Sequence, residues 1–183
     1  MWHLDYSSGW FCAGSRLCSR NMTTTSQNGW PASADRNSIA VKNFLIDGAN
    51  QHFAMCSAAA PVLAAFLKEF NTLIQPINPA GAVFDDWGWN HALIPNTQDL
   101  SNHASGTAVD VNATKHVWKA ATSGYTPMQE TMIDALTRKY GLRWGWRYAH
   151  GWKDPMHFEV IETPAQVKAR IIKMKLPMPK VMI

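Results

Sequence analysis

The chain has few cysteines and few charged side chains, which excludes several kinds of protein. Cys12, Cys18 and Cys56 are its three cysteines, and no two of them form a CxxC pair. The sequence therefore favours neither a disulfide framework nor a zinc site made of cysteines. Charged residues make up 16% of the 183 residues, and no dense Lys/Arg block accompanies the net charge of +4. A mildly basic surface, without a nucleic-acid-binding role, is the simplest interpretation.

Long apolar runs and a secretory signal are also missing. The longest apolar stretch, residues 58–70, is interrupted by Pro61, Lys68 and Glu69, whereas a membrane-spanning helix requires roughly 20 apolar residues. We therefore expect no membrane insertion. Residues 1–21 lack a basic start, a continuous apolar segment and a cleavage site, so they do not resemble a signal peptide. We interpret them as an N-terminal extension or a cloning remnant, and residues 22–183 as one domain.

Three segments are expected to be helical. Hydrophobic residues, 46% of the chain, suffice for a core. In residues 61–74 and 127–140 they recur at spacings of three and four, and Gly141 follows the second segment as a stop signal. A terminal helix is expected over residues 167–175, among the 24 residues after Glu159, too few for a separate wall-binding domain.

Strands are expected between and after these helices. Residues 28–47 predict a loop followed by a helix or short strands, and the aromatic run 84–89 favours a strand. Residues 142–148 and 156–162 predict two further strands, joined by a turn around 151–154. We find no internal repeat.

The segment SNHASGTAVD, residues 101–110, offers a histidine and an aspartate separated by six residues, with Gly106 between them. Imidazole nitrogen and carboxylate oxygen are normal zinc ligands, and a catalytic zinc site has three protein ligands and one open position for water. His103 and Asp110 are thus two candidate ligands. DPMHFE, residues 154–159, offers His157 as a third, although spacing alone does not select it from seven histidines.

Both motifs resemble those of the superfamily of zinc peptidases that contains D-Ala-D-Ala carboxypeptidases and L-alanyl-D-glutamate peptidases. SNHASGTAVD looks like the signature SxHxxGxAxD, DPMHFE looks like the second motif, and WGW before Arg147 is similar to the strand that precedes it. The likeness runs in order from about Asn28 to Glu159 and is best matched by the phage endolysin branch.

The resemblance implies a fold and a metal site. The fold would be α+β, like that of hedgehog and the D-Ala-D-Ala peptidases, with a small antiparallel sheet that carries the zinc site and with flanking helices. His103, Asp110 and His157 would bind one Zn²⁺, and Asp154 would be the catalytic base. Zinc lowers the pKa of a bound water to about 7, and a nearby carboxylate can take its proton and deliver it to the leaving amine.

One departure from the superfamily pattern concerns an arginine upstream of the first motif. Relatives commonly carry this cation, which helps to stabilise the oxyanion, whereas the stretch here reads WGWNHALIPN. Asn90 or His91 could donate instead, or Arg143 or Arg147 could reach in from another strand, and the sequence does not choose among them.

Other polar and aromatic residues near the motifs have secondary roles to consider. Ser101 is expected to support the site by hydrogen bonding, and Gly106 to permit a tight backbone path. His150 either lines the cleft or lies on the surface, and no position of the superfamily requires His116 as a ligand. Core packing is expected for most of the nearby tryptophans, which are Trp87, Trp89, Trp118, Trp144, Trp146 and Trp152.

The function that the resemblance implies is that of an endolysin, a zinc-dependent peptidase that hydrolyses a stem-peptide amide of bacterial peptidoglycan, with the L-Ala–D-Glu bond preferred. A D-Ala-D-Ala carboxypeptidase is the alternative within the same chemistry. A catalytically silent zinc-bearing wall-binding module is the alternative of another class, and a nucleic-acid-binding protein is the most distant one. We expect a monomer that is made in the host cytoplasm and reaches the wall through a holin.

Overall fold

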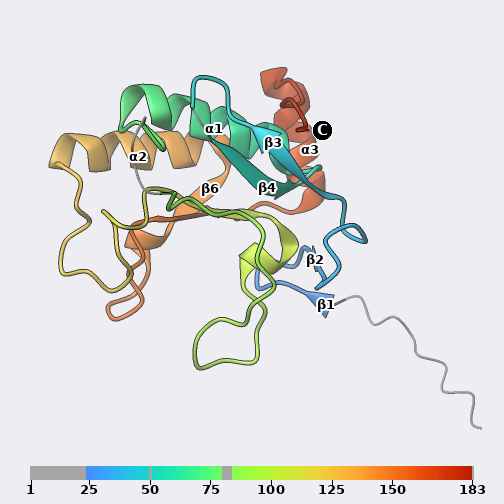
Figure 1. The fold of residues 1–183 in the computed structure, drawn as a ribbon, viewed down its shortest axis with the longest axis horizontal. Coiled ribbons are helices and arrows are strands. Elements are labelled where there is room, and N and C mark those ends of the chain that lie inside the picture. The colour runs from blue at the N-terminus through green and yellow to red at the C-terminus, as the bar shows by residue number, and fades with distance from the viewer. Residues whose placement is uncertain (1–23, 50, 80–83, 183) are drawn as a thin grey trace, which may run out of the picture.

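A computed structural model describes residues 24–49, 51–79 and 84–182, which form an α+β fold (Figure 1). The α+β expectation is thereby confirmed. The described strands are β1 (Thr24–Thr25), β2 (Pro31–Ala32), β3 (Val41–Leu45), β4 (His52–Cys56), β5 (Ala108–Asp110), β6 (Leu142–Trp144) and β7 (His157–Val160). The described helices are α1 (Ala60–Leu73), α2 (Pro127–Tyr140), α3 (Pro164–Met174) and the short 3₁₀ helices η1 (Asn102–Ser105) and η2 (Gly145–Arg147). Residues 1–21, interpreted above as an extension, lie outside the described residues.

The strands form small antiparallel sheets. β1 pairs with β2, β3 pairs with β4, and the third sheet has the order β5-β7-β6. Backbone bonds join the β3–β4 hairpin to the surroundings of the third sheet, because Cys56 donates to the Gly106 carbonyl at 2.8 Å and Trp89 to the Ala54 carbonyl at 2.7 Å. Within the third sheet, the central strand β7 is paired with β5 on one edge and with β6 on the other.

One face of the β5-β7-β6 sheet packs against α1 to form the core. The fully buried Phe158 ring of β7 lies 4.8 Å from the Phe66 ring and 5.5 Å from the Phe70 ring of α1. Because side chains alternate along a strand, His157 and Glu159 point to the opposite face. Because the apolar face is buried against α1, the polar side chains of β7 lie on the other face of the sheet.

The three expected helices are present, and their ends follow from local signals. At the start of α2, Thr126 and Gln129 form a reciprocal capping box, and at its end Gly141 adopts a left-handed conformation. α1 begins with Pro61 in its first turn, and α3 begins with a second capping box at Thr163. α1 and α2 lie side by side, and α3 lies near the C-terminus (Figure 1).

Two expected strands differ from the structure. The run 84–89 is not a strand, since only Trp87 forms a bridge, with Asp110. The Asp85 and Asp86 side chains instead accept hydrogen bonds from the backbone of 112–114, and this fixes the run as a loop. The strand expected over 142–148 ends at Trp144, because the Gly145 carbonyl turns to accept from Tyr148 and Asp154.

None of the helices among the described residues combines the length and the apolar character that a crossing of the bilayer requires.

The contact of β7 with α1 gives a first test of the fold. We expect Phe158→Ala to lower the free energy of unfolding by about 3–5 kcal/mol, because it leaves a cavity among fully buried aromatic rings. Urea denaturation followed by circular dichroism measures this change. Leu73→Ala is the control, since Leu73 is 51% exposed and its loss should cost about 0.5 kcal/mol or less. Equal effects of the two substitutions would contradict the packing described.

Candidate metal centre

The first motif forms a tight turn that presents His103 from η1. Ser101 caps this helix, and its hydroxyl accepts a hydrogen bond from the His103 backbone N–H at 3.3 Å. The supporting role expected for Ser101 therefore has a structural basis. Gly106 ends η1 with φ of 67°, and a Cβ there would lie 2.7 Å from the Cys56 nitrogen. Only glycine fits this backbone path on both grounds.

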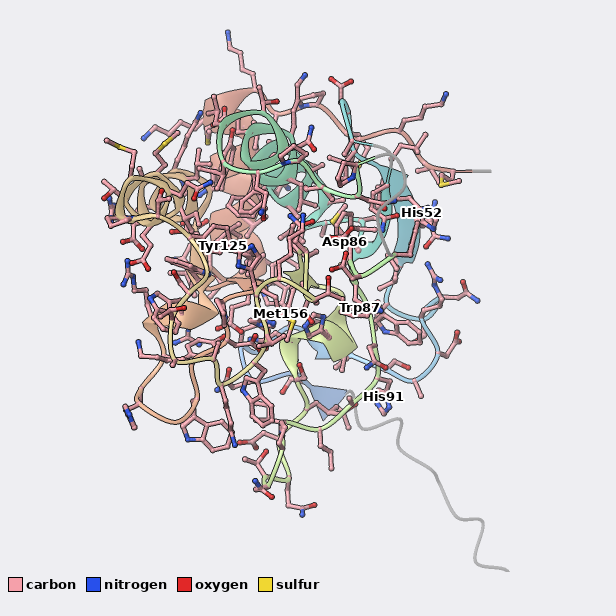
Figure 2. All side chains as sticks on the ribbon, turned by 60° about the vertical axis from the view of Figure 1, so that its left-hand side comes forward. His52, Asp86, Trp87, His91, Tyr125 and Met156 are labelled. Carbon is pink, nitrogen blue, oxygen red and sulfur yellow. The ribbon has the colours of Figure 1, made fainter. Side chains whose placement is uncertain are left out.

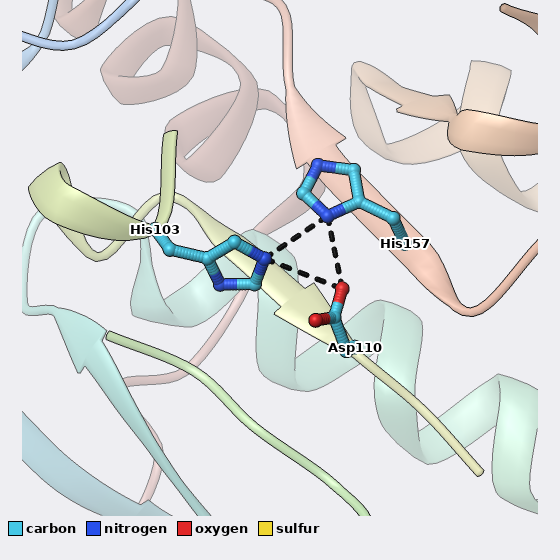
Figure 3. A group of neighbouring side chains, drawn as sticks. All are labelled: His103, Asp110 and His157. Atoms are coloured by element: carbon cyan, nitrogen blue, oxygen red, sulfur yellow. Dashed lines mark hydrogen bonds and ion pairs between the residues drawn. The ribbon is translucent and has the colours of Figure 1, made fainter. Parts of the chain in front are cut away.

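The other two candidate ligands lie opposite each other on paired strands. Asp110 of β5 is in register with His157 of β7, so their side chains share one face of the sheet. His157 Nδ1 lies 2.9 Å from Asp110 Oδ1 and 3.0 Å from His103 Nε2, and the third side of this triangle measures 3.2 Å (Figure 3). The structure thus brings together the three residues that the sequence motifs suggested as ligands.

The outer nitrogens of both imidazoles have partners that fix the tautomers. His103 Nδ1 lies 2.7 Å from the Gly88 carbonyl, which can only accept a hydrogen bond. His157 Nε2 lies 3.3 Å from a Glu159 carboxylate oxygen. With protons on these outer atoms, the inner nitrogens of the neutral rings present lone pairs to each other and to the Asp110 carboxylate. Three acceptors that converge at about 3 Å require a cation or an added proton between them.

The triangle fits a zinc ion. Zinc–nitrogen and zinc–oxygen bonds of about 2.0–2.2 Å in tetrahedral geometry separate neighbouring ligand atoms by about 3.3 Å. The distances of 2.9–3.2 Å lie close to this value. Two nitrogens and one carboxylate oxygen are also a normal donor set for zinc with an open fourth position. His103, Asp110 and His157 could therefore hold a metal ion.

The protonation state of the metal-free cluster follows from burial and charge. Burial alone would raise the pKa of Asp110, but His103 and His157 outweigh it and hold that pKa far below its usual range. Burial would lower the pKa of His157, but Asp110 and Glu159 outweigh it and raise that pKa to about 10. Without metal, a proton on His157 takes the place of the cation.

Glu159 is a site residue that the sequence analysis missed. It is 2% exposed, and one of its carboxylate oxygens contacts His157 Nε2 and accepts from Asn102. Its other carboxylate oxygen accepts from two guanidinium nitrogens of Arg143. Its position two residues after His157, on the same strand face, was the signal in the sequence that could have identified it.

Gly88 is the second residue that was missed. A Cβ at this position would lie 2.2 Å from the Ala54 carbonyl oxygen of β4, so glycine is required where the loop passes between β4 and η1. Its carbonyl is the outer partner of His103. No signal for this contact exists in the local sequence, because it depends on the approach of the β3–β4 hairpin.

Asp154, the expected base, lies in the loop before β7. Its backbone carbonyl accepts from the His157 N–H at 3.2 Å, and its buried Oδ1 has no hydrogen-bond partner among the described residues. Burial raises the pKa of Asp154 to about 6. The negative charge of Asp110 also raises this pKa, whereas His157 and His103 lower it. An unpartnered buried carboxylate oxygen beside three candidate ligands is suited to contact a water or a substrate group.

The candidates for the missing arginine lie in different places. Asn90 and His91 are exposed, and His91 lies near the outline of the molecule in Figure 2. His150, which was expected either to line the cleft or to lie on the surface, is exposed as well. Arg147 is paired with Glu130 and Asp134 of α2, away from the cluster. Arg143 reaches the site indirectly, through Glu159.

The remaining histidine and the tryptophans also have defined positions. His116 is buried and stacked on Tyr125 at 3.7 Å, with its ring nitrogens near the Ser123 carbonyl and Gln75, which indicates a structural role. Core packing accounts for only part of the tryptophans: Trp144 is buried and Trp89 and Trp146 are partly buried. The exposed ones are Trp87, Trp118 and Trp152.

Comparison with known proteins supports the superfamily suggested by the motifs. A family model described as D-alanyl-D-alanine carboxypeptidase matches residues 95–160, a span that contains the three candidate ligands and Asp154. The match supports a metallopeptidase of this superfamily. No curated protein and no solved structure matches the chain.

The contact between His157 and Glu159 predicts an effect on metal affinity. We expect Glu159→Gln to weaken zinc binding about 10- to 100-fold, because an outer carboxylate orients the ligand imidazole and raises its basicity. Competition with a chromophoric chelator measures this affinity. Glu162→Gln is the matched control, since Glu162 pairs with Arg170. An unchanged zinc affinity in Glu159→Gln would exclude this role.

The raised pKa of His157 predicts that metal binding depends on pH. Because this pKa is about 10 without metal, His157 is protonated at pH 7 and must lose its proton when it binds a metal ion. We expect release of about one proton per zinc, and an affinity that weakens about tenfold for each pH unit below the pKa. Calorimetry in buffers of different ionisation enthalpy measures the release, and a value near zero would contradict the assignment.

Proposed function

We propose that the chain is a zinc-dependent peptidase that hydrolyses an amide bond in the peptide stem of bacterial peptidoglycan. The observation that carries the proposal is the convergence of His103 Nε2, Asp110 Oδ1 and His157 Nδ1 within 3.2 Å of one another. The unpartnered Oδ1 of Asp154 supports it, because hydrolysis of an amide requires a base as well as a metal.

In this mechanism His103, Asp110 and His157 hold the zinc, which when bound supplies Lewis acidity toward a water and the scissile carbonyl. Asp154 takes the proton of the attacking water on its free Oδ1 and passes it to the leaving amine. Burial of Asp154, which raises its pKa, makes it a stronger base than an exposed aspartate and a competent acid in the second step. The Gly88 carbonyl and Glu159 keep both imidazoles oriented.

The bond we favour is L-Ala–D-Glu, which makes the protein an endolysin of the phage type. The stretch upstream of the first motif lacks the arginine with which a carboxypeptidase could bind the chain-terminal carboxylate, and this favours an endopeptidase. The alternative is D-Ala-D-Ala carboxypeptidase activity, which the description of the matching family favours. We further propose that the protein is a monomer and that it reaches the wall after holin-dependent release. Nucleic acid is not among the partners that we propose.

The proposal is tested on purified peptidoglycan incubated with the zinc-loaded protein, the chelated protein and Asp154→Asn. We expect new stem-peptide termini in the mass spectra with the zinc-loaded protein only, and a rate loss of at least about 100-fold in Asp154→Asn. The masses of the fragments identify the bond that is cut. Asp99→Asn is the matched control, since Asp99 is exposed on the loop before η1, and it should retain full activity.

Each other outcome has a definite meaning. Release of single D-Ala residues would support the carboxypeptidase. One bound zinc without any cleavage would contradict the peptidase and support a silent wall-binding module. Salt-sensitive DNA binding in a protein without wall activity would support the nucleic-acid-binding alternative.

A further inference from the structure

A polar cavity of about 330 Å³ adjoins the metal centre along β7. Its lining residues are Gln27, Asn28, Asn102, Arg143, Glu159, Val160 and Ile161. Glu159 connects the two sites, since its carboxylate contacts His157 Nε2. Residues two apart on a strand lie about 7 Å from each other and share a face, so the cavity begins two residues along β7 from the candidate zinc ligand.

The floor of this cavity is rigid, because its polar groups are already hydrogen-bonded. Asn102 donates to Glu159 and accepts from the Asn28 backbone N–H. The Asn28 side chain donates to Thr107 and to the Val160 carbonyl. Glu159 receives two guanidinium nitrogens of Arg143 as well. These groups hold the shape of the cavity and have little capacity left for a ligand.

The side chains at the rim of the cavity, in contrast, retain N–H groups that can bind a ligand. Arg143 has five N–H groups; it donates from Nε and Nη2 to Glu159, and its guanidinium lies 4.9 Å above the Tyr148 ring. Its side chain is nevertheless 45% exposed, against 3% for Glu159. Gln27 is exposed on the same rim, where its carboxamide oxygen accepts from Asn102. The exposed side chain of Ile161 adds an apolar border.

Arg143 also differs from the other arginines of the described ranges in its position. It is in register with Glu159 across the β6–β7 pair, as Asp110 is with His157 across the β5–β7 pair. Directly opposed residues share a face, so the guanidinium stands on the side of the sheet that carries the ligands. Arg147, by comparison, is bound to α2.

We propose that this cavity is a recognition subsite for the substrate residue next to the scissile bond, and that Arg143 and Gln27 donate hydrogen bonds to an oxygen of that residue, either carboxylate or carboxamide. The inference rests on the proposed peptidase function, which it deepens. Because the charge of Glu159 is already compensated by Arg143, the subsite tolerates a neutral acceptor as well as an anion. A carboxylate forms the stronger, charge-assisted hydrogen bond.

The test measures peptide binding apart from catalysis. Asp154→Asn is used as the background, so that an uncleaved stem peptide can be titrated by calorimetry. Two synthetic peptides are compared, L-Ala–γ-D-Glu–L-Lys with a free α-carboxylate on the glutamate and the same peptide with an α-carboxamide. We expect Arg143→Lys and Gln27→Ala each to weaken binding of the carboxylate peptide about tenfold. The carboxamide peptide should lose less in Arg143→Lys.

Two controls separate the subsite from the metal centre. Arg147→Lys, the matched substitution on an arginine held by α2, should leave peptide affinity unchanged. Zinc content is measured in every variant and should stay at one per chain, since the Arg143→Lys substitution retains a cation beside Glu159.

The outcomes distinguish this inference from the proposed function. Equal affinities of the background protein, Arg143→Lys and Gln27→Ala for both peptides would overturn the subsite, even if the wild type cleaves the wall. Loss of peptide binding that follows loss of zinc would also overturn it, because Arg143 would then act only through Glu159. Absence of wall cleavage by the zinc-loaded wild type would instead reject the peptidase.

Discussion

The mutual repulsion of three hydrogen-bond acceptors, each with a lone pair directed at the same point, is the constraint on which the rest of this structure depends. His103, Asp110 and His157 turn two imidazole lone pairs and a carboxylate oxygen toward one point, at distances of 2.9–3.2 Å. Such a cluster is stable only with a cation at its centre or with an added proton. The fold supplies the framework that holds it: two paired strands, one capped 3₁₀ turn, and an outer partner for each ring.

The hydrophobic core determines which face of the β5-β7-β6 sheet carries the candidate ligands. Phe158 is packed against the rings of α1 on one face of the sheet, so His157 and Glu159 on either side of it along the chain must face the other way. Glu159 then links the metal centre to Arg143 and to the adjoining cavity. The residues that we propose for metal binding, base catalysis and substrate recognition therefore cluster around β7, which carries His157 and Glu159, and the loop before it, which carries Asp154.

The sequence predicted those features whose signals are local. Helix 127–140 was correct at both ends, because the proline, the following apolar spacing and Gly141 are encoded side by side. The candidate ligands were found because their motifs are short and ordered along the chain. Gly88 was missed, and the run 84–89 was wrongly expected to be a strand, because in both cases the deciding contact comes from a distant segment. Such long-range contacts leave no periodic pattern in a single sequence. Glu159 was missed although its position two residues after His157 was a local signal.

The most direct measurement is anomalous X-ray diffraction at the zinc absorption edge, on crystals of the zinc-loaded chain. We expect a single peak bonded to Nε2 of His103, Nδ1 of His157 and Oδ1 of Asp110, with a fourth position open to water. A zinc ion bound elsewhere, or the three side chains in contact without metal at saturating zinc, would contradict the metal centre and the peptidase mechanism derived from it.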